Sequence, residues 1–309
     1  MTDVAEKLEF TLSHVRMGAL AWGPSDGRLA LCVHGFPDSA DSWRPVATIL
    51  ADQGYRVVAP YTRGYAPTSL PDDGSHHIGA LMTDLVELHR ELGAPHDAVL
   101  IGHDWGAWTC NALAAWPESP FAEHISMALP PVQAIDVSEY GLARTLKMSA
   151  IQLRMSWYIL FFQLPVRPHR TLGRVIPRLW RDWSPCDSDT GQGAAHALTA
   201  LPNDAHRKAA VRYYRDMFRF TPPPAHYADL HRYRFELPCH PMLLLHGAVD
   251  GAMQVGYTEK LLDSLPAGSR TQTIPGAGHF LQVDRPGPVA EAILDYLASR
   301  PDPATQGQQ

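Results

Sequence analysis

The pattern of hydrophobic and polar positions alternates between two periods along most of the chain. Short apolar runs typical of β-strands are followed by longer stretches in which apolar residues recur every three or four positions, as in amphipathic helices. This alternation predicts an α/β fold with a mainly parallel sheet of eight strands flanked by helices. The predicted strands are Leu8–Leu12, Met17–Trp22, Leu29–His34, Arg56–Ala59, Ala98–Ile101, Ile125–Leu129, Met242–His246 and Arg270–Ile274.

The first two predicted strands differ from the rest. They are short and alternate between polar and apolar positions, which favours antiparallel strands at the start of the sheet. The later strands are nearly continuous apolar runs, as expected when helices cover both faces of a sheet. The predicted helices are Trp43–Gln53, Ile78–Leu92, Trp105–Trp116, Gly256–Ser264 and Pro288–Ala298.

The alternation stops between about Ile135 and Pro238. That stretch is rich in Arg, Tyr and Trp, has helical periodicity and is interrupted by prolines. We therefore expect a helical cap at residues 135–238, inserted into a core formed by residues 1–134 and 239–300. The polar residues 301–309 are predicted to be a flexible tail.

Groups of chemical interest follow directly after four of the predicted strands. Phe36 lies in the loop "HGFP", Asp104 in "GHDWG", Asp250 in "GAVDG" and His279 in "GAGHF". Because the carboxyl ends of parallel strands meet at one edge of a sheet, we expect the four to lie close together. Their order along the chain (nucleophile, acid, histidine) is that of an α/β-hydrolase triad.

Asp104 occupies the centre of the frame Gly102-x-Asp104-x-Gly106, a strand-to-helix turn in which a serine nucleophile is common. The flanking glycines leave room for a strained turn. A carboxylate needs no base to become a nucleophile, and the start of the predicted helix at Trp105 stabilises its charge. The alternative is that Asp104 only caps this helix. Its register with the other three strand ends favours the nucleophile.

Asp250 and His279 are separated by one predicted helix and one strand, a spacing that allows the carboxylate to orient the imidazole. Each has a structural alternative, as a turn former and as a loop histidine respectively. Asp136 is a competing acid, but Pro130 and Pro131 make that strand end a poor support for it.

The loop "HGFP" provides a further part of the predicted site. The backbone N–H groups of Phe36 and Trp105 are candidates for an oxyanion hole. Glycine at position 35 would let the loop backbone approach the nucleophile closely, and a cis Phe36–Pro37 bond suits so tight a turn.

Taken together, "HGFPDSADSW", "YTRGYAPTS", "GHDWGA", "GAVDGAM" and "GAGHFLQVDRP" resemble, in order and spacing, the motifs of the α/β-hydrolase-fold epoxide hydrolases. "WYILFFQLP" and "VRYYRDM" resemble the cap segments in which these enzymes each carry a tyrosine. The resemblance implies that Tyr158 and Tyr214 bind the epoxide oxygen, with Tyr213 as the rival of Tyr214. Phe36, Trp105 and the two tyrosines would line the substrate site.

The mechanism implied by the resemblance is hydrolysis of an epoxide to a vicinal diol through an ester on Asp104. His279, oriented by Asp250, would be the base, and no metal or organic cofactor is required. The segment "YTRGYAPT", called here the arginine loop after Arg63, departs from the family pattern at Tyr61, Thr62 and Ala66. We expect these three residues to affect substrate fit or packing.

Two other functions remain open. A haloalkane dehalogenase uses the same nucleophile, acid and base, but needs two N–H donors for the halide. Trp105 offers one donor, Phe36 has no side-chain donor, and the second would have to come from Trp157, Trp180 or Trp183. A non-catalytic sensor has no need of the intact triad. A serine esterase is disfavoured because the chain contains no G-x-S-x-G.

Composition and charge limit the classes of partner that the protein is expected to bind. The chain has 26 Lys and Arg against 32 Asp and Glu, a net charge of −6, which disfavours binding to nucleic acid. The N-terminal segment does not resemble a secretory signal and the longest apolar run is too short to span a bilayer. We therefore expect a cytoplasmic enzyme, without membrane contact, that acts on a small apolar epoxide. A monomer and a homodimer both remain open.

Cysteines and histidines are also informative. The four cysteines are scattered without a C-x-x-C pair, so free thiols are expected. His76 and His77 lie in a polar loop, where adjacent side chains diverge, and we expect them to be solvated rather than to bind a metal.

Overall fold

The computed structural model describes residues 4–165 and 168–300, in which eight strands form a single sheet of order β1-β2-β4-β3-β5-β6-β7-β8. Strand β2 is antiparallel to β1 and β4, and the remaining pairs are parallel. All eight predicted strands are confirmed, with ends that move by at most two residues. The strands are β1 (Glu6–Thr11), β2 (Arg16–Trp22), β3 (Arg28–Val33), β4 (Tyr55–Pro60), β5 (Val99–His103), β6 (Glu123–Met127), β7 (Met242–Gly247) and β8 (Arg270–Ile274).

Burial along the strands follows their place in the sheet. Every residue of β5, β6 and β7 is buried. In β5 and β7 this burial accounts for the nearly continuous apolar runs, whereas β6 buries Glu123, His124 and Ser126 as well. The edge strands β1 and β8 expose most of their residues. The strands that carry the candidate nucleophile and acid are therefore fixed in the centre of the core.

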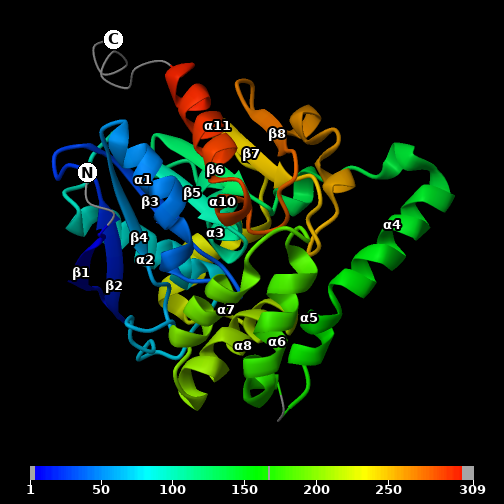
Figure 1. The fold of residues 1–309 in the computed structure, drawn as a ribbon, viewed down its shortest axis with the longest axis horizontal. Helices are drawn as coiled ribbons and strands as arrows, with labels where there is room; N and C mark the ends of the chain where they lie inside the picture. Colours follow the sequence, from blue (N-terminus) through cyan, green and yellow to red (C-terminus); the bar gives the residue numbers. More distant parts are fainter. Residues whose placement is uncertain (1–3, 166–167, 301–309) are drawn as a thin grey trace.

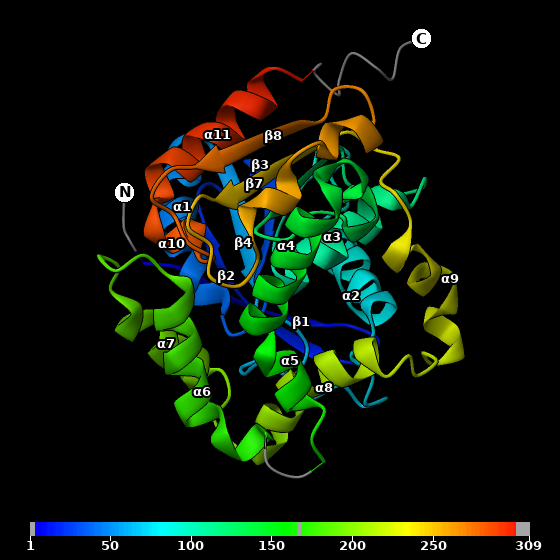
Figure 2. The ribbon, with the colours of Figure 1, turned by 90° about the vertical axis from the view of Figure 1, so that its right-hand side faces the viewer.

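Helices cover both faces of the sheet (Figure 2). Helix α1 (Arg44–Asp52) packs against α11 (Pro286–Ala298) on one face, while α2 (Ile78–Glu91) packs against α3 (Trp105–Ala115) on the other. The short α10 (Leu281–Asp284) joins the first pair. Four predicted helices are confirmed, and α11 begins two residues early, at a proline suited to a first helical turn.

The fifth predicted helix, Gly256–Ser264, is wrong. The structure has two 3-10 turns there, η6 (Val255–Thr258) and η7 (Leu261–Ser264). Between them Lys260 adopts a left-handed backbone conformation with φ 65°, which a continuous α-helix cannot contain.

The segment between β6 and β7 is helical, as predicted. Helices α5 to α8 lie together beside the sheet in both views (Figures 1 and 2), while α4 projects away from them in Figure 1. The cap boundaries at 135 and 238 stay a prediction, and the predicted flexible tail 301–309 lies outside the described residues. The longer helices are α4 (Gly141–Met155), α5 (Trp157–Phe162), α6 (Pro168–Trp183), α7 (Thr190–Thr199) and α8 (Asp204–Phe218). The short ones are α9 (Ala228–His231) and the 3-10 turns η1 (Ala40–Trp43), η2 (Val132–Ala134), η3 (Ser138–Tyr140), η4 (Ala225–Tyr227) and η5 (Arg232–Phe235).

Three further predictions concern the cysteines, membrane-spanning helices, and the histidines at positions 76 and 77. The four cysteines are free, as predicted. In the part of the chain that the structure describes, no helix has both the length and the apolar character needed to cross a bilayer. The solvated positions predicted for His76 and His77 are wrong: both are buried. Helix α8 covers their loop, so that His76 contacts the Tyr213 ring and His77 lies 3.6 Å from Asp216.

Candidate active site

The turn between β5 and α3 has the strained geometry expected of a nucleophile elbow. Asp104 has φ 53° and ψ −112°, a conformation that a non-glycine residue rarely adopts. A Cβ atom on Gly102 would lie 2.1 Å from the carbonyl oxygen of Gly106, so a side chain at position 102 would clash with the turn. The Asp104 side chain makes no capping hydrogen bond to α3. Its alternative role as a helix cap is therefore not supported.

The loop after β3 approaches the Asp104 carboxylate through its backbone. The N–H of Phe36 donates a hydrogen bond to Asp104 Oδ1 at 2.7 Å. A Cβ atom on Gly35 would lie 2.3 Å from the same Oδ1 and 2.5 Å from the backbone nitrogen of Trp105, which explains the glycine. The Phe36–Pro37 bond is cis, as predicted. Of the two amides predicted to form an oxyanion hole, that of Phe36 thus bonds to the carboxylate, and that of Trp105 begins α3 directly after Asp104.

His279 and Asp250 form a buried pair on the other side of Asp104. His279 Nδ1 lies 3.0 Å from Asp250 Oδ2, and His279 Nε2 lies 3.6 Å from Asp104 Oδ2. Asp250 Oδ1 accepts hydrogen bonds from the N–H groups of Ala252 and Met253. The acid is thereby held with its second oxygen toward the imidazole, as the sequence predicts.

The charges of this pair are strongly coupled. Burial lowers the pKa of His279, but the charge and hydrogen bond of Asp250 and the charge of nearby Asp104 outweigh it and raise this pKa to about 10. Burial in turn raises the pKa of Asp250, but the His279 imidazolium outweighs it and leaves this pKa below its usual value. At neutral pH the group is therefore an imidazolium between two carboxylates.

Two tyrosines from the helical segment face this group. Tyr158 in α5 and Tyr214 in α8 have ring centroids 5.5 Å apart, and both rings contact that of Phe36. Among the described residues the buried Tyr214 hydroxyl has no hydrogen-bond partner. Burial raises the pKa of both phenols. The negative charge of Asp104 raises the pKa of Tyr158 further, and Tyr158 followed by Asp104 does the same for Tyr214. Both therefore stay protonated and able to donate.

The neighbouring Tyr213 has a different environment. Its hydroxyl donates a hydrogen bond at 2.8 Å to the backbone carbonyl of Arg63, within the core. Adjacent residues on a helix point about 100° apart. Of the two tyrosines left open by the sequence, the structure brings Tyr214 and not Tyr213 beside Phe36.

Aromatic rings form a wall beside Asp104 and His279. The Trp183 ring lies 4.9 Å from that of His279 and 5.0 Å from that of Tyr158, while the Trp105 ring lies 5.0 Å from that of Tyr214. Trp105, Tyr158, Trp183 and Tyr214 are almost completely buried. Within this wall, Trp105 Nε1 and His279 Nε2 are also buried without a hydrogen bond from any described residue. The wall is apolar except for a few polar atoms directed inward, as in a small-molecule site.

Two residues without a role predicted from the sequence, His103 and Asp38, support His279 from behind. His103 Nε2 lies 2.9 Å from the His279 carbonyl oxygen, and His103 Nδ1 lies 3.6 Å from a buried carboxylate oxygen of Asp38. Asp38 also accepts hydrogen bonds from Ser42 and Gln282. Both His103 and Asp38 fall within motifs that the sequence marks as part of the site. Their contacts depend on the tertiary fold.

The remaining candidates lie outside the site. Asp136 is exposed and accepts a hydrogen bond from the backbone of Ser138, so it does not compete with Asp250. The Trp180 indole donates to the Pro37 carbonyl at 2.6 Å.

The three departures in the arginine loop make packing contacts. Tyr61 donates to Asp41, the Thr62 N–H donates to His34, and Ala66 bonds to the Ala200 backbone. This agrees with the packing role considered for them.

Comparison with known proteins agrees with this geometry. The sequence model of the alpha/beta hydrolase fold family matches residues 31–286. Epoxide hydrolase A of Mycobacterium tuberculosis is 30% identical over 92% of this chain and 94% of its own. The chain belongs to the epoxide hydrolase family of the α/β hydrolase fold.

Solved structures of the same fold include members with different names. The crystal structure of epoxide hydrolase A from Mycobacterium thermoresistibile has a TM-score of 0.73 at 25% identity, covering 96% of this chain and 99% of that one. A loop variant of haloalkane dehalogenase from Bradyrhizobium elkanii has a TM-score of 0.70 at 20% identity, covering 96% and 97%. The second likeness shows the shared fold alone.

Proposed function

We propose that this epoxide hydrolase family member converts an epoxide and water into a vicinal diol through a covalent ester on Asp104. The observation that carries the proposal is the position of the Asp104 carboxylate. One of its oxygens accepts the Phe36 N–H, while the other faces the imidazole of His279. The rings of Tyr158 and Tyr214 contact that of Phe36, the residue whose N–H bonds to this carboxylate. An alkyl carbon between carboxylate and phenols would have a nucleophile on one side and acids on the other.

In the first half-reaction, Asp104 attacks a ring carbon as the carbon–oxygen bond of the epoxide breaks. The oxygen takes a proton from Tyr158 or Tyr214, whose hydrogen bonds stabilise the developing negative charge. The imidazolium of His279 then returns a proton to the phenol through solvent. The enzyme is left with a neutral ester, a neutral imidazole and two neutral phenols.

Formation of the ester changes the electrostatics of His279. The ester carries no charge, so one of the two carboxylates that hold a proton on His279 is lost. The pKa of the imidazole falls just when a base is needed. Attack by Asp104 therefore prepares the base for the second half-reaction.

In the second half-reaction, neutral His279 takes a proton from water, which attacks the ester carbonyl carbon. The N–H groups of Phe36 and Trp105 stabilise the tetrahedral oxyanion. The intermediate collapses, the diol oxygen takes a proton from the imidazolium, and the carboxyl proton of Asp104 returns to His279. Each turnover consumes one epoxide and one water, and no metal or organic cofactor takes part.

The aromatic wall favours a small apolar substrate. Its rings exclude water from the reacting atoms, while the inward polar atoms are few. We also propose that the enzyme works in a reducing cytoplasm, since its four cysteines are free.

Haloalkane dehalogenation is the second candidate, because the buried Trp105 Nε1 lacks a hydrogen-bond partner among the described residues. A halide needs a second donor. Trp180 is disfavoured for that role because its indole already donates to Pro37. Epoxide hydrolysis instead uses the paired phenols and is the better supported of the two.

A panel of epoxides and haloalkanes, assayed for both diol and halide, tests the proposal. We expect the wild type to form diol from an apolar epoxide such as styrene oxide and to release no halide. Asp104→Ala should form no diol. Normal diol formation by Asp104→Ala would refute the assigned nucleophile. Release of halide without turnover of any epoxide would favour the dehalogenase.

A further inference from the structure

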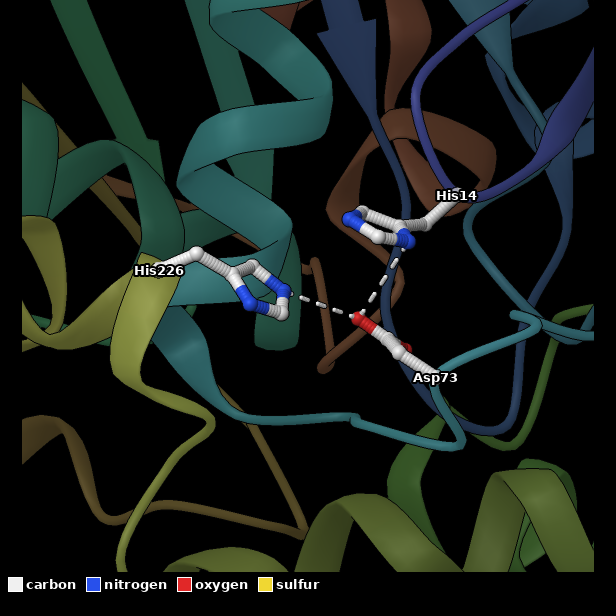
Figure 3. A group of neighbouring side chains, drawn as sticks. All are labelled: His14, Asp73 and His226. Carbon is white, nitrogen blue, oxygen red and sulfur yellow. Dashed lines mark hydrogen bonds and ion pairs between the residues drawn. The ribbon is translucent and has the colours of Figure 1, made fainter.

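We propose that His14, Asp73 and His226 form a binding site for a divalent transition-metal ion, with Zn²⁺ as the ion that fits the ligands best. His14 lies in the turn between β1 and β2, Asp73 in the loop between β4 and α2, and His226 in η4. Figure 3 shows a ring nitrogen of each histidine directed at the same carboxylate oxygen of Asp73. The proposed site lies outside the candidate active site and does not depend on the proposed reaction.

The three ligand atoms are close to the spacing that a single ion requires. His226 Nε2 lies 3.4 Å and His14 Nδ1 3.9 Å from Asp73 Oδ2, and the three atoms all lie within 4.8 Å of one another. Tetrahedral ligands about 2.0–2.2 Å from Zn²⁺ lie about 3.3–3.6 Å apart. The two distances to Asp73 are therefore within a few tenths of an ångström of the required spacing, and the two imidazole nitrogens would have to approach each other by up to about 1.5 Å. The histidine rings are stacked at 4.8 Å with 21° between their planes, and a nitrogen of each ring is directed at Asp73 Oδ2.

Hydrogen bonds from behind hold the Asp73 carboxylate in this orientation. Its Oδ2 accepts the Tyr227 hydroxyl at 2.6 Å, and its Oδ1 accepts the Ser75 N–H at 2.9 Å. The guanidinium of buried Arg63 lies 3.6 Å from Oδ1. Carboxylate ligands of metals are commonly fixed by such outer partners. The oxygen shared by the two imidazoles is therefore pre-positioned.

A fourth ligand lies next to the group. Asp72 Oδ1 is 2.7 Å from His14 Nδ1 in the absence of an ion. When Nδ1 exchanges its proton for a metal, this carboxylate can turn to the same ion and complete a tetrahedral set of two nitrogens and two oxygens. The side chain of His226 is 48% exposed and that of Asp72 72% exposed, so an ion reaches the group directly from solvent.

The proposed ion would connect three segments that are distant in sequence. It would join the β1–β2 turn and the loop of Arg63 to the chain that leaves α8, at the end of the helical segment. Because the ligands come together only in the folded chain, binding the ion would raise the melting temperature. The alternative is an ion-pair cluster in which a protonated His14 simply pairs with Asp72. That cluster would bind no metal.

The test is a Zn²⁺ titration of the chelator-treated full-length protein by calorimetry, combined with thermal unfolding. We compare the wild type with His14→Asn, His226→Asn and the double variant. His96→Asn, which replaces an exposed histidine in the loop before β5, is the matched control. We expect one tight site in the wild type and the control, and affinity at least about 10-fold weaker in each single variant, since even outer partners of a ligand contribute this much. Absence of tight binding in the wild type, or unchanged binding in the double variant, would overturn the proposal.

X-ray absorption of the wild-type zinc complex tests the same site without any variant. We expect two imidazole nitrogens at about 2.0–2.1 Å together with oxygen ligands. A sulfur ligand, or a shell made of oxygen alone, would contradict the assignment even if the histidine variants failed to fold.

Discussion

His279 Nε2 lies 3.6 Å from Asp104 Oδ2, so the candidate base and the candidate nucleophile are electrostatically coupled before any substrate arrives. The coupling raises the affinity of the imidazole for its proton while Asp104 is charged. In the proposed mechanism it ends when Asp104 becomes an ester. Much of the proposed mechanism follows from this relationship.

Neutralising Asp104 should therefore lower the pKa of His279. In the wild type this pKa is raised to about 10, with Asp250 and Asp104 as the groups that raise it. In Asp104→Asn, which mimics the neutral ester, we expect a decrease of at least about one unit, equivalent to about 1.4 kcal/mol. Titration of the His279 ring signals by NMR measures the change. Equal values in the two proteins would mean that Asp104 does not control the base.

The same raised pKa makes stability depend on pH. A protonated His279 stabilises the fold fully below its unfolded pKa of 6.5, and this contribution is lost as pH rises through the folded value of about 10. His279→Gln lacks the titrating group. We expect the free energy of unfolding to fall more steeply with pH in the wild type than in His279→Gln between pH 6.5 and 10, as measured by urea unfolding. Parallel curves would contradict the raised pKa.

The two tyrosines of the wall should act on ring opening. Removing either hydroxyl, in Tyr158→Phe or Tyr214→Phe, should slow formation of the ester by about 10²-fold or more and leave its hydrolysis nearly unchanged. Stopped-flow measurement of the two half-reactions separates the effects. An equal loss in both steps would count against their role as acids.

Tyr213→Phe is the matched control for that pair. The Tyr213 hydroxyl bonds to the Arg63 carbonyl and not to the site. Its removal should cost about 1–3 kcal/mol of stability, because a buried acceptor loses its partner, and should change ring opening little. A loss of ring opening as large as in Tyr214→Phe would reverse the assignment of the two residues.

Gly35 tests the close approach of the loop to the nucleophile. In Gly35→Ala the new methyl group would lie 2.3 Å from Asp104 Oδ1, which forces the carboxylate or the loop to move. We expect formation of the ester to slow by about 10²-fold, as a displacement of about 1 Å can produce. Gly173→Ala, within α6, is the control, since its methyl group would meet nothing and alanine favours a helix. Rapid ester formation by Gly35→Ala would show that the approach is not needed.

Much of the fold could be predicted because its signals are local. A buried strand such as β5 is a continuous apolar run, and the glycines around Asp104 mark a tight turn in the sequence itself. The order of Asp104, Asp250 and His279 after parallel strands was then enough to bring them to one edge. The failed helix at 256–264 had helical periodicity, but Lys260 takes a left-handed conformation that the pattern does not reveal.

The parts that could not be predicted depend on distant contacts. The burial of His76 and His77 follows from α8 packing on a loop that is polar in sequence. His103 and Asp38 support His279 through a backbone carbonyl, an interaction with no sequence signature. The histidines of the proposed metal site are separated by more than 200 positions, whereas common metal motifs place ligands a few residues apart.

The central claim is that the diol is formed through an ester on Asp104. A single turnover with enzyme in excess over styrene oxide, in ¹⁸O-labelled water, tests it most directly. Because water attacks the carbonyl carbon of the ester, we predict that mass spectrometry will find one ¹⁸O in the peptide that contains Asp104 and none in the diol of the first turnover. Label in that first diol, with an unlabelled Asp104, would show direct attack of water on the epoxide and contradict the mechanism.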